Sequence, residues 1–183
     1  MKMLTHRIPI GSADPFNLAT VKEHLIVDFS DADAEIAILA RSSALELEHF
    51  AQIALLNQTI RVTLFSPPVG PSGMQLPIGP TADDAVATVL IDGAVFSDFR
   101  FVPGPRPYIH WGESYRASEV QWMTIEYIAG FGAAHDDIPS DLMQAVMDQV
   151  ALQFDSRGSV DHKMHTTSPH LTRIGAKYRG VRA

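Results

Sequence analysis

The stretch from residue 125 to residue 142 begins Ile125-Glu126-Tyr127-Ile128-Ala129-Gly130-Phe131 and ends Ile138-Pro139-Ser140-Asp141-Leu142. Its first part continues an alternation of polar and apolar residues that starts at Val120, which is typical of a strand with one buried face. Its second part starts a helix, because proline is tolerated in a first helical turn and apolar residues follow at a spacing of four. The chain therefore passes here from a β region into a helix that extends from about Pro139 to Phe154.

Two helices are predicted before the β region. The first covers about residues 18–27, with Asn17 as the N-cap that accepts hydrogen bonds from the first free amides. The second covers about residues 31–56, because its apolar residues recur near the helical period. Ser30 and Asp33 give this second helix a start that resembles a capping box.

The segment between the helices predicts four or five strands, mostly antiparallel. Residues 59–65 alternate polar and apolar side chains and are rich in β-branched residues. Residues 86–101 predict a hairpin around Asp92-Gly93, since both turn residues tolerate positive φ. The Gly, Pro and Ser residues between Pro67 and Pro80 predict a long irregular loop or arm.

Composition limits the class of protein. The chain has 183 residues, of which 46% are hydrophobic and 19% charged, so it is long enough and apolar enough to bury a core. It contains no cysteine, which excludes disulfides and thiolate metal sites. The first residues lack the apolar segment of a signal peptide, and no apolar run approaches membrane-spanning length. We therefore expect a soluble protein made in the cytoplasm, with no membrane partner.

Charge is concentrated at the C-terminal end. Residues 157–183 hold six basic side chains and one acid, a net charge of +5, which leaves −12 of the total of −7 on residues 1–156. This tail looks polar and irregular, with too few apolar residues to hold itself in a core.

Together these patterns predict an α+β protein, in which a small helical bundle from both ends of the chain carries an inserted antiparallel β domain and an extended C-terminal tail. The expected parts are an N-terminal helical part (1–57), the inserted β region (58–130), a C-terminal core helix that completes the bundle (131–156) and the basic tail (157–183).

The side chains that could support catalysis are scattered. His162, His165 and His170 could approach a metal ion, but their segment offers no scaffold to fix ligand geometry, which zinc sites need. The sequence His135-Asp136-Asp137 is better explained as the polar loop before Pro139, with acids placed favourably near a helix N-terminus. A metal-dependent hydrolase that uses the C-terminal histidines remains an alternative.

Asp28, Asp31 and Asp33 have a spacing that faintly suggests a calcium loop. The glycine and the later glutamate of such a loop are missing, so helix capping explains them better.

Six segments, in this order along the chain, resemble the head-tail connector, or adaptor, family of long-tailed bacteriophages and related phage-like gene transfer agents. They are Leu18-x-x-Val21-Lys22-x-His24-Leu25-x-Val27-Asp28, Asp31-x-Asp33-x-x-Ile36-x-x-Leu39, Ile125-x-Tyr127-x-Ala129-Gly130-Phe131, Ile138-Pro139-x-x-Leu142-x-x-Ala145-Val146, Phe154-Asp155-x-Arg157 and Tyr178-Arg179.

The resemblance implies a structural protein of a virion or phage-like particle, synthesised in the host cytoplasm. It implies a ring of about twelve copies that docks on the portal protein, extends the DNA channel and connects the capsid to the tail through a tail-side neck or stopper protein. Double-stranded DNA would pass through without sequence-specific binding. The resemblance carries over no catalytic residue, no metal site and no cofactor.

The basic tail is the expected portal-docking element. Tyr178 would act as an aromatic anchor, and arginines would supply bidentate hydrogen bonds. The residues assigned to docking are Arg173, Lys177, Tyr178, Arg179 and Arg182. The competing interpretation is a nucleic-acid-binding accessory protein, held by phosphates, although the basic residues are widely spread and no helix-turn-helix or zinc-finger pattern is present.

Overall fold

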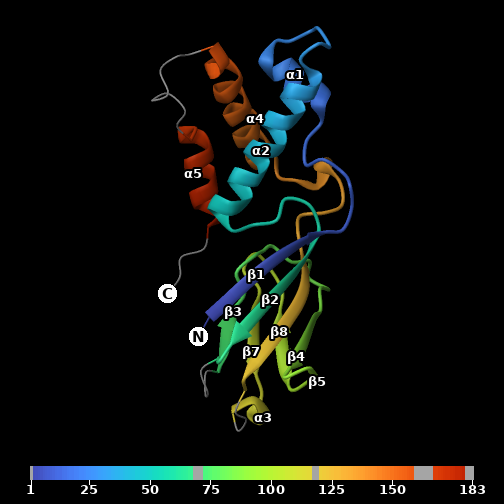
Figure 1. Ribbon diagram of the computed structural model, residues 1–183, viewed down its shortest axis with the longest axis vertical. Coiled ribbons are helices and arrows are strands. Elements are labelled where there is room, and N and C mark those ends of the chain that lie inside the picture. Colours follow the sequence, from blue (N-terminus) through green and yellow to red (C-terminus); the bar gives the residue numbers. More distant parts are fainter. Residues whose placement is uncertain (1, 68–71, 117–119, 159–166, 180–183) are drawn as a thin grey trace. The chain divides into compact units, whose positions relative to one another are not determined.

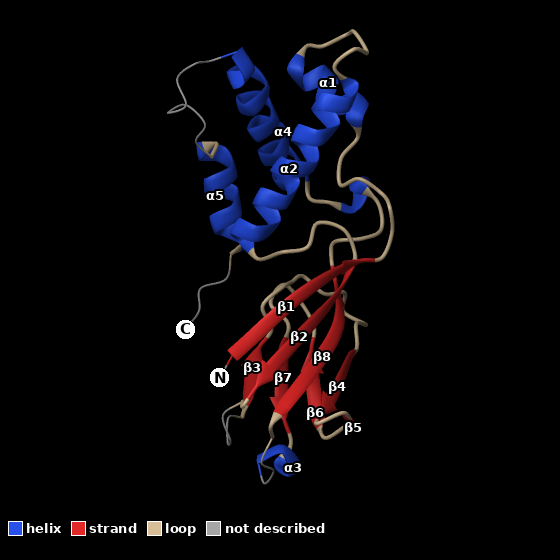
Figure 2. Ribbon diagram, viewed as in Figure 1, coloured by secondary structure: helices blue, strands red, loops and turns tan. Residues whose placement is uncertain are grey.

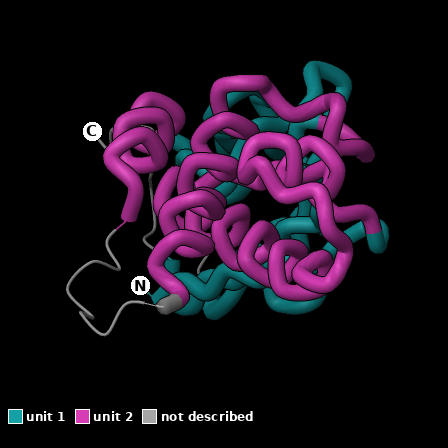
Figure 3. The backbone as a smooth tube through the Cα atoms, turned by 90° about the horizontal axis from the view of Figure 1, so that it is seen from above, with its two compact units in different colours: residues 1–12, 56–131 teal, residues 13–55, 132–183 magenta. Residues whose placement is uncertain are grey.

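The computed structural model describes residues 2–67, 72–116, 120–158 and 167–179. The chain divides into two compact units, each made of two separate stretches (Figure 3). Residues 1–12 and 56–131 form the β unit, and residues 13–55 and 132–183 form the helical unit. The predicted α+β class is confirmed.

The helical unit is organised around two long helices (Figures 1 and 2). The bounds of its elements are α1 Leu18–Leu25, α2 Asp33–Ala51, η1 His135–Asp137, α4 Ser140–Asp155, η2 Ser156–Gly158 and α5 Pro169–Tyr178. α1 and α5 each pack on both α2 and α4, and α2 packs on α4. In the part of the chain that the structure describes, no helix is long and apolar enough to cross a membrane.

The apolar faces of α2 and α4 form the core of this unit. Leu142, Val146 and Val150 on α4 are fully buried, as are Ile36 and Leu47 on α2. Spacings of four on α4 and eleven on α2 place these residues on one face of each helix, which is why the two faces pack together. The predicted helix 139–154 is therefore confirmed, with Pro139 in the N-cap position.

The ends of α1 and α2 are set by local contacts. Asn17 caps α1 as predicted, since its Oδ1 accepts a hydrogen bond of 2.9 Å from the Ala19 amide. The capping box predicted at Ser30 is wrong: Ala32 occupies the N-cap position of α2, no side chain caps it, and Asp33 pairs with Lys22 at 2.6 Å.

α2 ends at Ala51, before the predicted end at Leu56, because Gln52 takes the left-handed conformation with φ 55°. The buried Glu48 carboxylate then accepts the Leu55 amide at 2.7 Å, so the side chain of the last helical turn binds the chain that leaves it.

The β unit contains two antiparallel sheets (Figure 2). The strand bounds are β1 Lys2–Pro9, β2 Gln58–Phe65, β3 Gly73–Gln75, β4 Ala87–Ile91, β5 Ala94–Phe96, β6 Phe99–Val102, β7 Tyr108–Trp111 and β8 Trp122–Ala129, and a short helix α3 covers Glu113–Arg116. The larger sheet has the order β1-β2-β8-β4-β5 and the smaller sheet the order β3-β7-β6.

Alternating side chains of the larger sheet face the smaller one. Met123, Ile125 and Tyr127 of β8 are buried, as their predicted common face requires. The ring of Tyr127 lies 6.2 Å from that of Phe101 on β6, and its hydroxyl donates a hydrogen bond of 2.9 Å to the Ile78 carbonyl. Burial raises the pKa of this hydroxyl, so it remains a donor at any ordinary pH.

The predicted hairpin turn is confirmed, because Asp92 and Gly93 both have positive φ, at 48° and 86°.

The first strand of the chain was not predicted from the sequence. β1 lies in the range 1–57 that the sequence analysis assigned to the helical part, yet it pairs along its whole length with β2. It is an edge strand and mostly exposed on both faces, so it carries no alternating apolar pattern.

The predicted arm 67–80 is wrong in part, because it contains β3 and buries Leu76 and Ile78. Gly73 permits this strand: a Cβ atom there would lie 2.3 Å from the Ile109 carbonyl oxygen of β7. The same glycine and proline content that permits the close approach of the two strands also hides the strand in the sequence.

We expect Leu142→Ala to lower the free energy of unfolding of the helical unit by about 3 kcal/mol, because truncating a fully buried leucine leaves a cavity between α2 and α4. Urea unfolding followed by the helical circular dichroism signal measures it. Leu45→Ala is the matched control: Leu45 is 53% exposed on α2, so the same truncation should change stability by less than about 0.5 kcal/mol. Equal losses in the two variants would contradict this assignment of the core.

Candidate interaction surface on the helical unit

Helix α5 presents the basic residues of the C-terminal part. Ser168 caps it by accepting a hydrogen bond of 3.3 Å from the His170 amide, and Pro169 occupies its first turn, where a missing N–H costs nothing. Leu171 and Ile174 are buried. At Gly175 a Cβ atom would lie 2.4 Å from the Phe50 ring, so the glycine brings α5 close to α2.

The expectation of an irregular tail is therefore wrong for residues 169–178. Leu171, Ile174, Gly175 and Tyr178 stand at positions i, i+3, i+4 and i+7, which place them on one narrow helical face. Together with the Ser168-Pro169 start, this pattern is a usable helix signal. A segment of ten residues holds only two aliphatic side chains on that face, so its composition looks polar.

The five predicted docking residues have different surroundings. Arg173 is exposed and has no ion-pair partner among the described residues. The Arg179 guanidinium is exposed and lies 5.7 Å from the centre of the Phe50 ring. Lys177 and Tyr178 both bind Asp141 on α4. Arg182 lies outside the described residues.

Asp141 anchors the end of α5. Its Oδ2 accepts a hydrogen bond of 2.8 Å from Lys177 Nζ, and its Oδ1 accepts one of 2.9 Å from the Tyr178 hydroxyl. Burial alone would raise the pKa of Asp141, but the hydrogen bonds and the Lys177 charge outweigh it and lower the pKa. Burial and the neighbouring carboxylate raise the pKa of Tyr178 to about 12.

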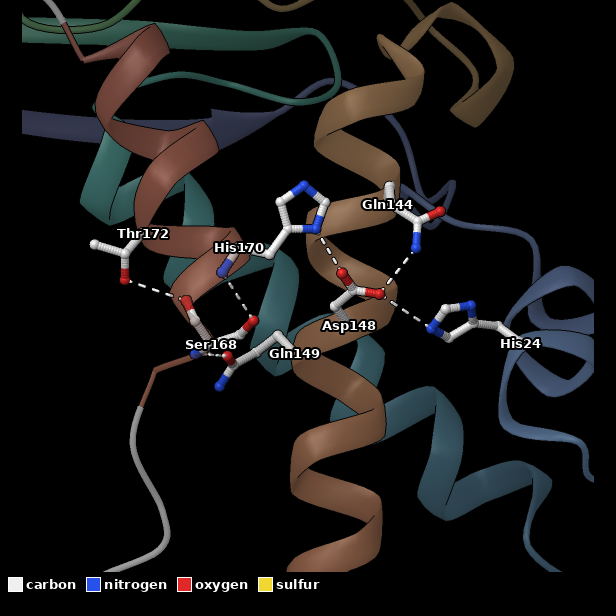
Figure 4. A network of polar contacts seen from close by, with 7 residues as sticks. All are labelled: His24, Gln144, Asp148, Gln149, Ser168, His170 and Thr172. Atoms are coloured by element: carbon white, nitrogen blue, oxygen red, sulfur yellow. Dashed lines mark hydrogen bonds and ion pairs between the residues drawn. The ribbon is translucent and has the colours of Figure 1, made fainter.

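Asp148 on α4 joins the helical unit's two outer helices (Figure 4). Its Oδ1 lies 3.2 Å from His24 Nε2 of α1 and accepts a hydrogen bond of 2.8 Å from Gln144, while its Oδ2 contacts His170 Nδ1 of α5. His24 and His170 are therefore held by one carboxylate. This contact gives both histidines a structural role in joining α1 and α5 to α4.

The start of α5 is fixed by a second set of polar contacts. Gln149 Oε1 accepts a hydrogen bond of 2.6 Å from the Ser168 amide, as Figure 4 shows. Glu46 of α2 accepts hydrogen bonds from Gln149 at 3.3 Å and from the Thr167 hydroxyl at 2.8 Å. α5 is thus tied at both ends, and its outer face is held at a fixed orientation on α2 and α4.

Of the three histidines singled out for metal binding, only His170 lies in the described part of the chain. His162 and His165 lie outside the described residues, and His135 Nε2 lies 3.2 Å from Asp136 Oδ1 in the polar loop predicted before α4. Among residues 2–67, 72–116, 120–158 and 167–179, no three histidine or carboxylate side chains form a group that could hold a metal ion.

The fold is shared with chains of solved particles. No protein-family model and no curated protein matches the sequence. A chain of the virion of a native gene transfer agent (GTA) particle superposes with a TM-score of 0.76 at 22% identity, over 98% of this chain and 97% of that chain. Chains from two neck structures are similar: the neck of an empty GTA particle computed with C6 symmetry (TM-score 0.74, 22%, coverage 98% and 97%) and the neck of a native GTA particle computed with C12 symmetry (0.72, 22%, 97% and 97%).

We expect Asp141→Asn to lower the free energy of unfolding by about 1 kcal/mol at neutral pH, because it removes the charge that holds Lys177 and Tyr178. The folded-state pKa of Asp141 is lowered, so its stabilisation is complete above the unfolded pKa, about 3.9, and is lost as the pH falls through the folded value. The stability gap between the parent protein and the variant should therefore close progressively as the pH falls below about 4.

Urea unfolding at a series of pH values tests this. Asp83→Asn, the same change at an exposed position of the β unit, should leave stability at neutral pH within about 0.5 kcal/mol. If the difference in unfolding free energy between the parent protein and Asp141→Asn grew as the pH fell, Asp141 would not stabilise the folded state through its charge.

Proposed function

We propose that this protein is a structural head-tail adaptor, which docks on the portal as a ring, extends the DNA channel and connects the capsid to the tail. The observation that carries the proposal is the likeness of the fold, over 97–98% of the chain, to chains of GTA virion and neck structures. The resemblance of six sequence segments to the adaptor family supports the same conclusion. Both point to a component of a particle.

The proposed assembly is a homo-oligomeric ring of about twelve copies. The solved necks were computed with C12 and C6 symmetry, which supports a ring architecture for chains of this fold. In this arrangement double-stranded DNA passes through the ring without sequence-specific binding. The portal lies on one side and a tail-side neck or stopper protein on the other.

The outer face of α5 is the proposed portal-docking surface. Arg173, Lys177 and Arg179 are exposed on it, and α5 carries no acid. Because Asp141 and Asp148 hold the helix, these cations are positioned before binding, which lowers the entropic cost of docking. Arg182 continues the basic series, and Tyr178 serves by fixing α5 rather than by entering the portal.

The outer face of the larger sheet is a second exposed surface, suited to the tail-side protein. Leu4, Phe65, Trp122 and Ile128 are between 38% and 49% exposed there. Arg61 and Glu126 pair with each other at the middle of this face. Scattered aromatic and aliphatic anchors around a satisfied ion pair are typical of a protein-binding surface.

The alternatives draw less support. A hydrolase built on the C-terminal histidines would need His170, which already contacts Asp148. A nucleic-acid-binding accessory protein would need a strongly basic surface, but Glu35 and Asp141 partly neutralise Arg157 and Lys177. The helical unit as a whole holds fourteen acids and eight basic residues, which repels phosphate and suits a channel through which DNA slides.

We expect the double variant Arg173→Gln, Arg179→Gln to bind the particle's portal protein about tenfold more weakly at low salt, because two exposed charge contacts are lost. Raising the salt concentration should weaken the parent protein more than the variant, since exposed pairs are screened. Surface-immobilised portal and a salt titration measure both effects. Point substitutions are preferable to removing the end of α5, because Lys177 and Tyr178 hold that helix through Asp141.

Arg100→Gln is the matched control, because Arg100 is an exposed arginine of the β unit. It should bind portal like the parent protein. Particles assembled with the double variant should accumulate as heads without tails. Unchanged affinity of the double variant would reject the α5 face as the docking surface, and absence of any portal binding by the parent protein would reject the proposed function.

A further inference from the structure

Four large apolar side chains are exposed in the described part of the helical unit, and they fall in two places. Ile26 and Phe29 lie in the connection between α1 and α2, which we call the tip (residues 26–31). Ile38 and Leu45 lie on α2 and form what we call the stripe. Neither pair is part of the α5 face proposed to dock on the portal.

Ile26 suits neither its backbone conformation nor its exposed position. It occupies the left-handed region, with φ 57°, which disfavours a β-branched residue and favours glycine or asparagine. Its side chain is 93% exposed, so burial within the chain does not repay the strain. A strained, exposed, apolar residue indicates a contact made outside the chain. Phe29, three positions later, is 53% exposed and enlarges the same apolar surface.

The stripe likewise places apolar residues on the face of α2 where an amphipathic helix carries polar ones. Ile36, Ala40 and Leu47 face the core, which places Ile38 and Leu45 at the middle of the opposite face, two turns apart. Their exposed fractions are 63% and 53%. An outer helical face normally carries polar residues at its centre, and an apolar pair at this spacing is the usual anchor of a helix-binding contact.

Ion pairs border the stripe on both sides. Arg41 donates two hydrogen bonds of 2.8 Å to Asp14 on one side, and Arg157 pairs with Glu35 on the other. An apolar centre within a polar rim is the usual anatomy of a protein interface.

The tip is complementary to this surface. It is apolar at Ile26 and Phe29, and it carries Asp28 and Asp31, exposed acids with no ion-pair partner in the described part of the chain. On the stripe's rim the side chains of Arg41 and Arg157 are 52% and 35% exposed, so they can each meet a further carboxylate. A contact of two different patches on identical chains is head-to-tail, and it closes into a ring when the rotation allows it.

We propose that the tip of one copy packs on the stripe of the next copy. Ile26 and Phe29 cover Ile38 and Leu45, and Asp28 and Asp31 lie at the rim near Arg41 and Arg157. The contact supplies the subunit interface of the ring, and in that respect it rests on the proposed function. The partner is a second copy of this chain.

Cross-linking tests the pairing directly, because the chain has no cysteine of its own. Phe29→Cys in one copy and Leu45→Cys in another place a single thiol on each patch, and a short bis-maleimide joins thiols that lie close together. A mixture of the two variants at high protein concentration, with and without portal, should give a cross-linked dimer. Each variant alone should give none, and the chain that carries both changes should give a ladder of multimers.

Ala176→Cys, an exposed position on α5, is the control and should not cross-link to either patch. Dimers from Leu45→Cys alone would show a symmetric stripe-to-stripe contact and overturn the proposal. Equal cross-linking to Ala176→Cys would also overturn it, as non-specific.

Ile26→Asn separates assembly from folding. Asparagine accepts the left-handed conformation, so the variant should melt at the same temperature as the parent protein or a few degrees higher, yet associate about tenfold more weakly. Sedimentation and thermal melting measure the two quantities. Normal self-association of Ile26→Asn would reject the tip contact. If portal binding and ring formation persist without tip–stripe cross-links, this inference fails while the proposed function stands.

Discussion

The burial of one face of α2 is the constraint on which the helical unit depends. α1, which precedes α2, and α4 and α5, which follow the whole β unit, all pack on α2. Ile36, Ala40 and Leu47 become buried only when segments from both ends of the chain pack on α2. Burying such side chains contributes about 1.5–3 kcal/mol each for the larger ones, so the helical unit is completed only after the chain returns from the β unit. The two units are therefore interleaved in the sequence, because the chain passes between them after residues 12, 55 and 131 and the helical core is incomplete until the last of these passages.

Carboxylates of α4 then determine how α5 is held. Asp141 binds the end of α5 and Asp148 its beginning, and Asp148 also binds α1. The contrast in the sequence between an acidic body and a basic tail is therefore partly internal: Lys177 is neutralised within the fold, whereas Arg173 is not paired in the described part. Counting charges along the sequence overstates the number of cations available to a partner, and the geometry identifies which of them face outward.

The sequence predicts the helices and strands that bury one face and that begin and end at typical start and turn signals. α4, β2, β8 and the Asp92-Gly93 hairpin have apolar residues at the periods of a helix or strand, and the structure contains all of them. It does not predict β1, which has little buried surface to leave a pattern, or β3, whose glycine serves close strand pairing. α5 was missed because only Leu171 and Ile174 are aliphatic on its buried face. Most of the candidate docking residues lie on α5 or at its end, but only packing distinguishes Lys177 and Tyr178, which hold α5, from Arg173, which faces outward.

Three exposed positions, 26, 38 and 45, hold apolar residues where the fold itself favours other residue types. In a chain shaped by folding alone, position 26 would hold glycine or asparagine, and positions 38 and 45 would be polar. These three residues are mostly exposed in the chain itself, and the contact proposed between copies would bury them. That contact involves α2 and the connection before it, whereas the cations proposed to meet the portal lie on α5. A ring subunit needs contacts with its neighbours and with the portal at the same time, and assigning them to different helices lets each form without displacing the other.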